Sequence, residues 1–165
     1  MIEVPAAAAA SFRAIGVDLG TRRIGVALSD SAGSLATPYE VVLRSGDEVR
    51  DHRRLAELVE EAGAERIVVG YPLSLAGGVG PAAQAVIEEC ERLRSRVAVP
   101  VELCDERLTT VTADRALQAQ GVKGRARRQV IDKVAASVIL EAWLQGEHRR
   151  RRDAATPLSP GRQRP

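Results

Sequence analysis

Two short apolar runs lie near the amino terminus, AIGV at 14–17 and IGVAL at 24–28, with a polar turn between them. Their length and spacing predict a β-hairpin with strands at 14–18 and 24–29. The first strand ends on Asp18, and a glycine and a threonine follow in the turn. A carboxylate beside a glycine turn fits either a cradle for nucleotide phosphates or one ligand of a metal site.

The segments after the hairpin alternate between strands and helices. A strand at 35–43 contains Pro38, which suits an edge position or the start of a strand. Periodicity, glycine caps and short apolar runs predict the later elements. These are helices at 45–63, 81–96, 109–121 and 129–145, and strands at 66–70 and 99–104. The order β-β-β-α-β-α-β-α-α predicts an α/β protein whose mixed five-stranded sheet carries helices on both faces.

The chain of 165 residues, 45% of them apolar, is long enough for one domain with a substantial core. We expect that domain at 13–145, after a flexible leader at 1–12 and before a disordered Arg- and Pro-rich tail at 146–165. The tail holds six arginines against two acids, whereas the rest of the chain holds 18 basic and 20 acidic residues. The positive charge of the folded part must therefore be local if it binds nucleic acid.

Two cysteines, Cys90 and Cys104, are too few for a disulfide framework and lack a metal-binding spacing. Ordinary thiols are typical of a reducing compartment, so we expect a cytoplasmic protein. An intermolecular disulfide through Cys90 stays open, because that residue falls on a predicted helix. No apolar run approaches the length of a membrane span, so we expect no membrane partner.

Carboxylates recur at three separate places along the chain. Asp18 ends one strand, and Asp105 and Glu106 follow another. Asp132 lies inside the most apolar helix, two turns before Ile139 on its core-facing stripe. A lone buried carboxylate is costly unless it is paired or binds a metal, and strand ends of an open sheet are where sites form. Together, these positions favour one shared acidic site.

Oxygen ligands of this kind suit Mg²⁺ or Mn²⁺, and two such ions about 4 Å apart can promote hydrolysis of a phosphodiester. We expect both His52 and His148 to be solvated, so no zinc site is predicted. Each acid also has a simpler interpretation: a turn-forming Asp18, a surface ion pair of Glu106, and a paired or solvent-facing Asp132. All three would have to hold by coincidence, so we favour the shared site.

Basic residues lie beside the third acid. Five occur within eleven positions, and they are Lys123, Arg125, Arg127, Arg128 and Lys133. Such a run is either a solvated face or a contact for a phosphate backbone. Arg22, in the hairpin turn, is placed to reach the same strand. These six residues are the candidate nucleic-acid contacts.

Four segments, taken together, resemble the motif blocks of one family. They are GVDLGTRRIGVALSD at 16–30, VVGYPLSLAGG at 68–78, DERLTT at 105–110 and VIDKVAASVIL at 130–140. In this order they are similar to the bacterial YqgF (RuvX) nuclease family. The resemblance implies an RNase H-like fold and a relationship to the Holliday-junction resolvase RuvC. It also implies a nuclease that processes the 5′ end of pre-16S rRNA or, in some members, resolves junctions.

The same resemblance implies roles for individual residues. The catalytic and metal-binding acids fall on Asp18, Glu106 and Asp132, and Glu106 rather than Asp105 takes the metal role. The loop after the second block departs from the family pattern. Where the family usually has Asn, an apolar residue and Asp, this chain has residues 74–76, SLA. Polar contacts from the first and third positions are weakened or lost, and we assign no catalytic role to the serine.

The leading hypothesis is therefore a Mg²⁺- or Mn²⁺-dependent nuclease for pre-rRNA, with branched DNA as the alternative substrate. Symmetric cuts on a junction need two active sites and hence a homodimer, whereas the rRNA reaction also suits a monomer. Two other functions stay open. One is an ATPase like those of actin and sugar kinases, which normally needs two such lobes. The other is a ribosome-assembly factor with little turnover.

Overall fold

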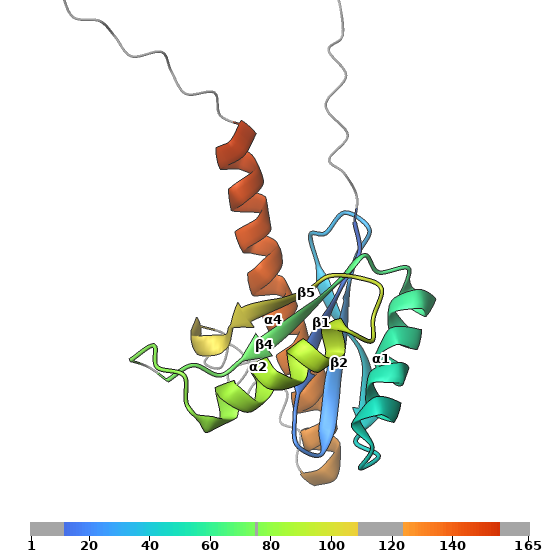
Figure 1. The fold of residues 1–165 in the computed structure, drawn as a ribbon. Helices are drawn as coiled ribbons and strands as arrows, with labels where there is room; N and C mark the ends of the chain where they lie inside the picture. Colours follow the sequence, from blue (N-terminus) through green and yellow to red (C-terminus); the bar gives the residue numbers. More distant parts are fainter. Residues whose placement is uncertain (1–11, 75, 109–123, 156–165) are drawn as a thin grey trace, which may run out of the picture.

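The computed structural model describes residues 12–74, 76–108 and 124–155 (Figure 1). An antiparallel meander comes first, formed by β1 (Ala14–Leu19), β2 (Arg23–Ser29) and β3 (Ala36–Leu43). There follow α1 (Glu48–Ala62), β4 (Arg66–Tyr71), α2 (Pro81–Arg94), β5 (Val101–Asp105), the short 3-10 turn η1 (Glu106–Leu108) and α4 (Gly124–Ala155). The helix predicted at 109–121 lies outside the described residues.

The five strands form one mixed sheet in the order β3-β2-β1-β4-β5. The β1–β2 and β2–β3 pairs are antiparallel, whereas β1–β4 and β4–β5 are parallel. Pro38 lies on β3, an edge strand, where its missing amide hydrogen costs least. Because β1, β4 and β5 run in the same direction, their carboxyl ends reach one edge of the sheet. The predicted fold class is confirmed.

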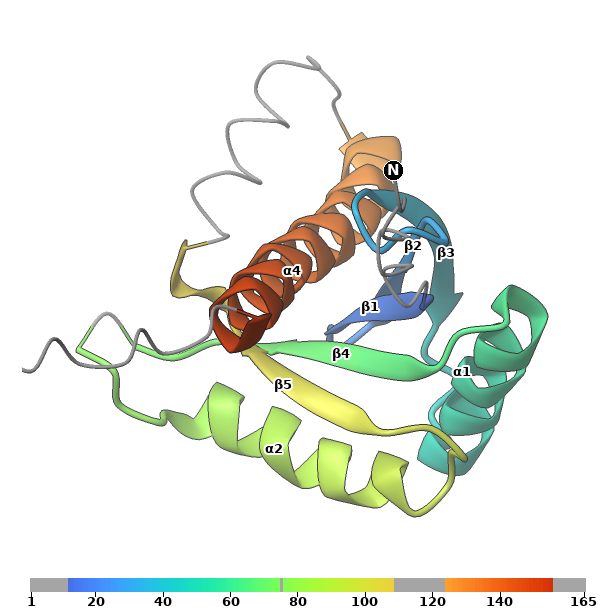
Figure 2. The same cartoon turned by 90° about the horizontal axis from the view of Figure 1, so that it is seen from above.

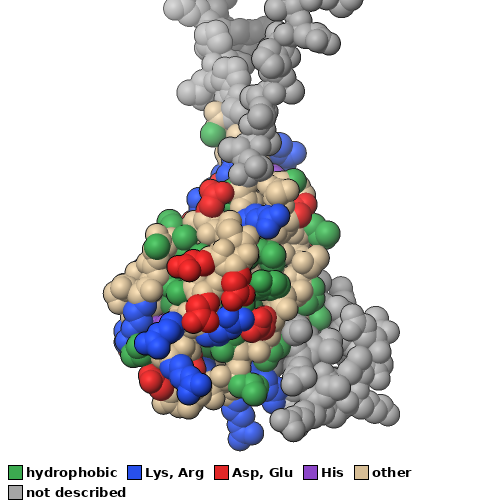
Figure 3. Space-filling view, turned by 90° about the vertical axis from the view of Figure 1, so that its right-hand side faces the viewer, with side chains coloured by type: hydrophobic (Ala, Val, Ile, Leu, Met, Phe, Trp, Pro, Cys, Tyr) green, Lys and Arg blue, Asp and Glu red, His purple; other side chains and the backbone are tan. Residues whose placement is uncertain are grey.

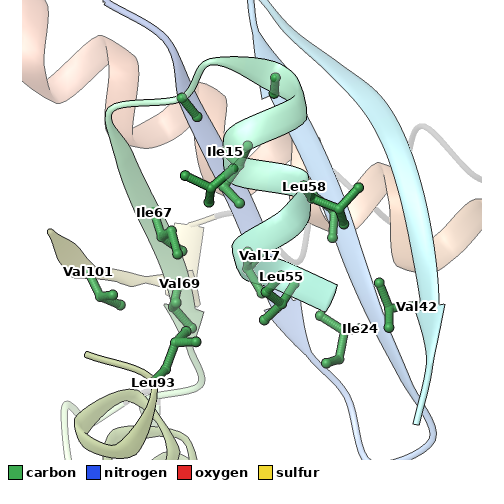
Figure 4. Close-up of a cluster of buried hydrophobic side chains, with 14 of the residues drawn as sticks. Ile15, Val17, Ile24, Val42, Leu55, Leu58, Ile67, Val69, Leu93 and Val101 are labelled. Carbon is green, nitrogen blue, oxygen red and sulfur yellow. The ribbon is translucent and has the colours of Figure 1, made fainter. Parts of the chain in front are cut away.

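Helices α1 and α2 cover one face of the sheet (Figure 2). The apolar cluster beneath them combines alternate strand residues with the inner sides of both helices (Figure 4). It includes Ile15, Val17, Ile24, Val42, Leu55, Leu58, Ile67, Val69, Leu93 and Val101. Asp47 begins α1 by accepting the amide hydrogen of Val49 at 2.9 Å, and Gly63 ends it at φ 60°.

Helix α4 covers the opposite face and packs mainly against β1, β2 and β3, with further contacts to β4 (Figure 2). The close approach depends on Gly16: a Cβ there would lie 2.6 Å from Leu140 Cβ and 2.7 Å from the carbonyl oxygen of Ala136. Helices therefore lie on both faces, as predicted. No helix in the described part of the chain is long and apolar enough to cross a membrane.

The structure differs from the sequence prediction at both ends of the domain. Phe12, which we expected in a flexible leader, is buried edge-on against Trp143. Helix α4 continues to Ala155, so residues 146–155 are helical where disorder was predicted. Glu147 pairs with two arginines one turn later, and His148 donates to the carbonyl oxygen of Gly33 at 2.8 Å. These contacts stabilise helical turns that composition alone does not favour.

Candidate active site

The carboxyl ends of the parallel strands meet around one cavity of about 520 Å³. Asp18 of β1, Gly70 of β4 and Glu106, the residue after β5, all line it. Strand β4 separates β1 from β5 in the sheet, so the two acids reach the same cavity from either side of β4. The structure thus brings together two of the three predicted acids.

Gly70 provides the room for this arrangement. A Cβ at this position would overlap Oε1 of Glu106 on one side and the side chain of Ile139 on the other. Any larger residue would therefore push the Glu106 carboxylate away from β4 or push α4 off the sheet. The glycine that ends the RIVVG run is thus a packing requirement of the acidic site.

The side chain of the neighbouring acid, Asp105, bonds to Arg107, two residues later in the chain. It accepts hydrogen bonds from the backbone amide of Arg107 at 3.0 Å and from the Arg107 Nε at 2.7 Å. These bonds lower the pKa of Asp105. Asp105 is thus paired with Arg107, whereas Glu106 lines the cavity with Asp18. This geometry supports choosing Glu106 over Asp105 for the acidic site.

Glu106 is held in an environment that disfavours its ionised form. Burial, followed by the negative charges of Asp18 and Asp105, raises the pKa of Glu106 to about 7. A divalent cation between these carboxylates would remove that penalty, and carboxylate oxygens are the ligands that Mg²⁺ and Mn²⁺ prefer. The carboxylates of Asp18 and Glu106, with the space that Gly70 leaves beside them, therefore fit such a metal. Perturbed acids in a cavity also mark a candidate site on general grounds.

Asp132 lies in α4, and its side chain is outside the described atoms. The direction in which α4 runs nevertheless shows on which side of Gly16 the backbone of Asp132 lies. Leu144 packs near Gly33 at one end of β1, while the Ala136 turn lies over Gly16. Four residues of helix advance about 6 Å, close to the rise of two strand residues. The backbone of Asp132, one turn before Ala136, therefore lies on the side of Gly16 toward which β1 runs to Asp18.

The predicted nucleic-acid contacts are only partly placed. Arg22 is exposed in the β1–β2 turn, four residues after Asp18. Arg125, Arg127, Arg128 and Lys133 belong to the first turns of α4, and their side chains are not described. Lys123 lies outside the described residues. On the face over α1, acidic and basic side chains are interspersed (Figure 3), so a binding surface for phosphates is not expected there.

The wall of the cavity opposite the acids contains residues that the sequence analysis missed. Arg44 and Glu89 line it and form a two-bonded pair at 2.6 and 3.0 Å. His52 contacts Glu89 at 3.1 Å and is fully buried, so the prediction of a solvated His52 is wrong. A signal was present, because His52 lies three residues before Leu55 on the apolar stripe of α1.

The hypothesis of an intermolecular bridge through Cys90 is not supported. Cys90 is fully buried in the cluster beneath α2, and burial raises the pKa of its thiol to about 11. A buried, protonated thiol is neither accessible nor nucleophilic. The prediction for His148 was half right, because that side chain is exposed but bonds to Gly33.

Ser74 has a structural role in the loop between β4 and α2. Its hydroxyl accepts the amide hydrogen of Gly78 at 2.8 Å, and its own amide donates to the carbonyl oxygen of Gly78 at 3.0 Å. The loop therefore closes without the asparagine that is usual in the family. Gly77 brings this loop beside Arg107, since a Cβ there would lie 3.3 Å from Arg107 Nη1.

A mixed five-stranded sheet with helices on both faces, and with carboxylates at the ends of β1 and β5, defines a protein of the RNase H-like fold. A structure described as T. thermophilus RuvC in complex with Holliday junction substrate has this fold as well. It superposes on 83% of this chain and 96% of its own with a TM-score of 0.51, at 14% sequence identity.

The chain belongs to the RuvX family, whose model is described as a Holliday junction resolvase and matches residues 12–146. A relative from Mycobacterium sp. (strain KMS), named "Putative pre-16S rRNA nuclease", is 51% identical over 133 residues, which are 80% of this chain and 79% of the relative. A protein of the same name from Mycobacteroides abscessus is 47% identical over 146 residues, 88% of each chain.

Proposed function

We propose that this protein is a metal-dependent nuclease that hydrolyses phosphodiester bonds during maturation of the 5′ end of pre-16S rRNA. Asp18, Glu106 and Asp132 are the catalytic acids in this proposal, and Mg²⁺ or Mn²⁺ is the cofactor. Two relatives named for that rRNA are about half identical over most of this chain, which supports the choice of substrate.

One observation carries the proposal. Two carboxylates from different strands line one cavity, and the pKa of Glu106 rises to about 7 through burial and the charge of Asp18. Such a cluster is unfavourable for folding on its own, and it suits a site that binds cations for chemistry. The backbone of Asp132 lies on the Asp18 side of Gly16, which agrees with a third ligand from α4.

In this proposal the acids bind the metal ions, and the basic residues bind the nucleic-acid strand. When bound, a pair of divalent ions would supply an activated water and stabilise the leaving oxygen of the phosphodiester. Asp18 and Glu106 hold the positive charge at the ends of β1 and β5. Arg22, exposed in the turn that follows Asp18, contacts a phosphate next to the scissile bond in this proposal. The basic residues at 123–133 keep the strand against the acids.

A second candidate function is resolution of Holliday junctions. The family description and the shared fold with a junction-bound RuvC favour it. This reaction needs two active sites related by symmetry, so it requires a homodimer. The rRNA reaction has no such requirement, which makes the two functions separable by oligomeric state.

The test is a cleavage assay with two substrates and Mn²⁺ or Mg²⁺. A precursor RNA with the 5′ extension of 16S rRNA and a four-way DNA junction are each incubated with the wild type and with Asp132→Asn. We expect metal-dependent cleavage of the RNA by the wild type and none by the variant. Faster cleavage of the junction, by a dimeric species in light scattering, would select the second function. Absence of any cleavage, with stoichiometric ATP binding in calorimetry, would contradict both.

A further inference from the structure

Arg44 connects the helical wall of the cavity to the turn that follows Asp18. Its Nε donates to the carbonyl oxygen of Gly20 at 3.0 Å, and its backbone amide donates to the carbonyl oxygen of Arg22 at 3.0 Å. Its two terminal nitrogens bind the two carboxylate oxygens of Glu89 on α2. One residue thus holds the β1–β2 turn at two points and anchors it to a helix.

The turn has little freedom to move by itself. The amide of Gly20 donates to the carbonyl oxygen of Asp18 at 3.0 Å, and a Cβ at Gly20 would overlap the carbonyl oxygen of Arg23. Because Gly20 is bonded to the backbone of Asp18, a displacement of Gly20 moves Asp18. The side chain that fixes Gly20 therefore also fixes the backbone of Asp18.

Glu89 is itself held in one orientation by His52. Nδ1 of His52 lies 2.8 Å from Arg96 Nη1, and a guanidinium only donates, so Nδ1 accepts. The ring hydrogen is then on Nε2, which donates to Oε1 of Glu89 at 3.1 Å. Arg96 also pairs with Glu48 on α1 at 3.1 Å. The network therefore runs from the Glu48–Arg96 pair through His52, Glu89 and Arg44 to the turn that follows Asp18.

The same residues invite comparison with a metal site. Ligand atoms of Glu48, His52 and Glu89 lie within 4.8 Å of one another. Arginines already occupy these atoms, since Arg92 binds both oxygens of Glu48 at 2.7 and 2.8 Å and Arg44 binds both of Glu89. A metal ion would have to displace guanidinium groups, so the cluster acts as a polar network.

We propose that Arg44 is a positioning residue that keeps Asp18 in place for metal binding, and that Glu89 and His52 orient Arg44. This inference rests on the proposed nuclease function only for its catalytic consequence. The side chains of Arg44 and Glu89 are 16% and 13% exposed, so solvent screens their interaction weakly. Three of the five guanidinium donors are used in bonds to the turn and to Glu89, which leaves Arg44 poorly suited to bind substrate.

The experiment compares Arg44→Met with Arg92→Met in the full chain. Arg92 forms an equally two-bonded pair between α1 and α2 but has no bond to the turn, which makes it the matched control. We measure amide hydrogen exchange at residues 19–23, Mn²⁺ binding by calorimetry, and RNA cleavage. Arg44→Met is expected to speed exchange in the turn and to weaken Mn²⁺ binding, each about tenfold, as expected for one lost buried hydrogen bond. Arg92→Met should stay within about twofold of the wild type.

Two further variants separate geometry from charge and from folding. Arg44→Lys keeps the charge, but one ammonium cannot reach both Gly20 and the two oxygens of Glu89, so it should behave like Arg44→Met. If Arg44→Met does not fold, Glu89→Gln replaces it, with the same direction of effect expected. Wild-type exchange and Mn²⁺ affinity in Arg44→Met, or full rescue by lysine, would overturn the proposal. A wild type that cuts no nucleic acid contradicts the proposed function instead, while the exchange contrast still decides the role of Arg44.

Discussion

Two of the glutamates that line the cavity have opposite pKa shifts. Hydrogen bonds from Arg92, with a further one from Arg96, lower the pKa of Glu48 to about 2. Burial and the charge of Asp18 raise the pKa of Glu106 to about 7. The residue type and the cavity are the same, so the difference comes from what each wall places beside the carboxylate.

The two walls therefore serve different ends. The wall formed by α1 and α2 pairs its acids with arginines and adds to stability. The wall formed by the strand ends gathers like charges around Gly70, which is unfavourable for folding but useful for binding a divalent cation. A change on the strand wall should therefore reduce activity more than stability, and a change in the Glu48–Arg92 pair of the helical wall should do the reverse. Arg44 is the exception on the helical wall, because it also holds the turn that follows Asp18.

The largest expected effect comes from removing a charge on the strand wall. Asp18→Asn should lower metal-dependent cleavage about 1,000-fold, equivalent to about 4 kcal/mol of transition-state stabilisation, because the metal loses a charged ligand. Its melting temperature in chelator should be unchanged or higher, since the repulsion on Glu106 is relieved. Single-turnover cleavage and thermal melting measure both quantities.

Asp105→Asn is the matched control for that prediction. Asp105 neighbours Glu106 but binds Arg107, so its loss should change cleavage by less than about tenfold. Equal loss of activity in Asp105→Asn and Asp18→Asn would mean that the strand wall does not distinguish the two kinds of acid.

Substitution of Gly70 tests whether Glu106 needs the space that this glycine leaves beside it. Gly70→Ala places a methyl group against Glu106 and Ile139, so we expect a loss of about 1–3 kcal/mol of stability and weaker Mn²⁺ binding. Urea unfolding and calorimetry report the two effects. Gly80→Ala is the control, because a Cβ at Gly80 meets nothing within 4 Å. A stable Gly70→Ala protein with wild-type metal affinity would show that Glu106 does not need this space.

The opposite pKa shifts predict opposite dependences of stability on pH in metal-free protein. Because the folded pKa of Glu106 is about 7, above its ordinary value of 4.5, stability from this group is lost as pH rises from about 5 to about 8. The pKa of Glu48 is about 2, so its contribution is present above about 4.5 and is lost as pH falls toward 2. After allowance for partial exposure, the Glu106 effect is about 1–2 kcal/mol.

Urea unfolding in chelator between pH 5 and 8 checks this prediction. Glu106→Gln should flatten the fall in stability that the wild type shows across this range. Glu48→Gln should keep that fall, since the group it removes titrates at lower pH. A wild type whose stability does not fall between pH 5 and 8 would contradict the raised pKa of Glu106.

The sequence predicted the fold and the acidic wall because both depend on local patterns. Apolar runs, turn residues and helix periodicity gave the order of the elements along the chain and hence the fold class, and Asp18 and Glu106 stand directly at strand ends. The helical wall was missed because its pairs are remote in sequence: Arg44 and Glu89 are 45 positions apart. His52 was misjudged because a polar residue on an apolar stripe reveals its burial only when its partners are known.

The prediction for the carboxyl end of α4 was wrong for a related reason. Composition predicted disorder after Gly146, yet the turns that hold Arg149–Arg152 are helical. Local pairs with Glu147 were visible in the sequence, but the contact of Arg151 over the ring of Phe12, at 4.6 Å, was not. Long-range contacts thus decided where the domain ends.

The smallest expected effect concerns those arginines, which lie about 26 to 30 Å along α4 from Asp132. If they contact the phosphates of a bound strand, Arg149→Gln with Arg152→Gln should weaken binding and reduce the slope of log affinity against log salt by about one unit per lost contact. Cleavage at saturating substrate should not change, because neither residue is near the acids. Arg50→Gln with Arg53→Gln, two exposed arginines on α1, is the matched control and should leave the slope unchanged. Equal slopes for both double variants and the wild type would restrict nucleic-acid binding to the strand wall and the amino-terminal turns of α4.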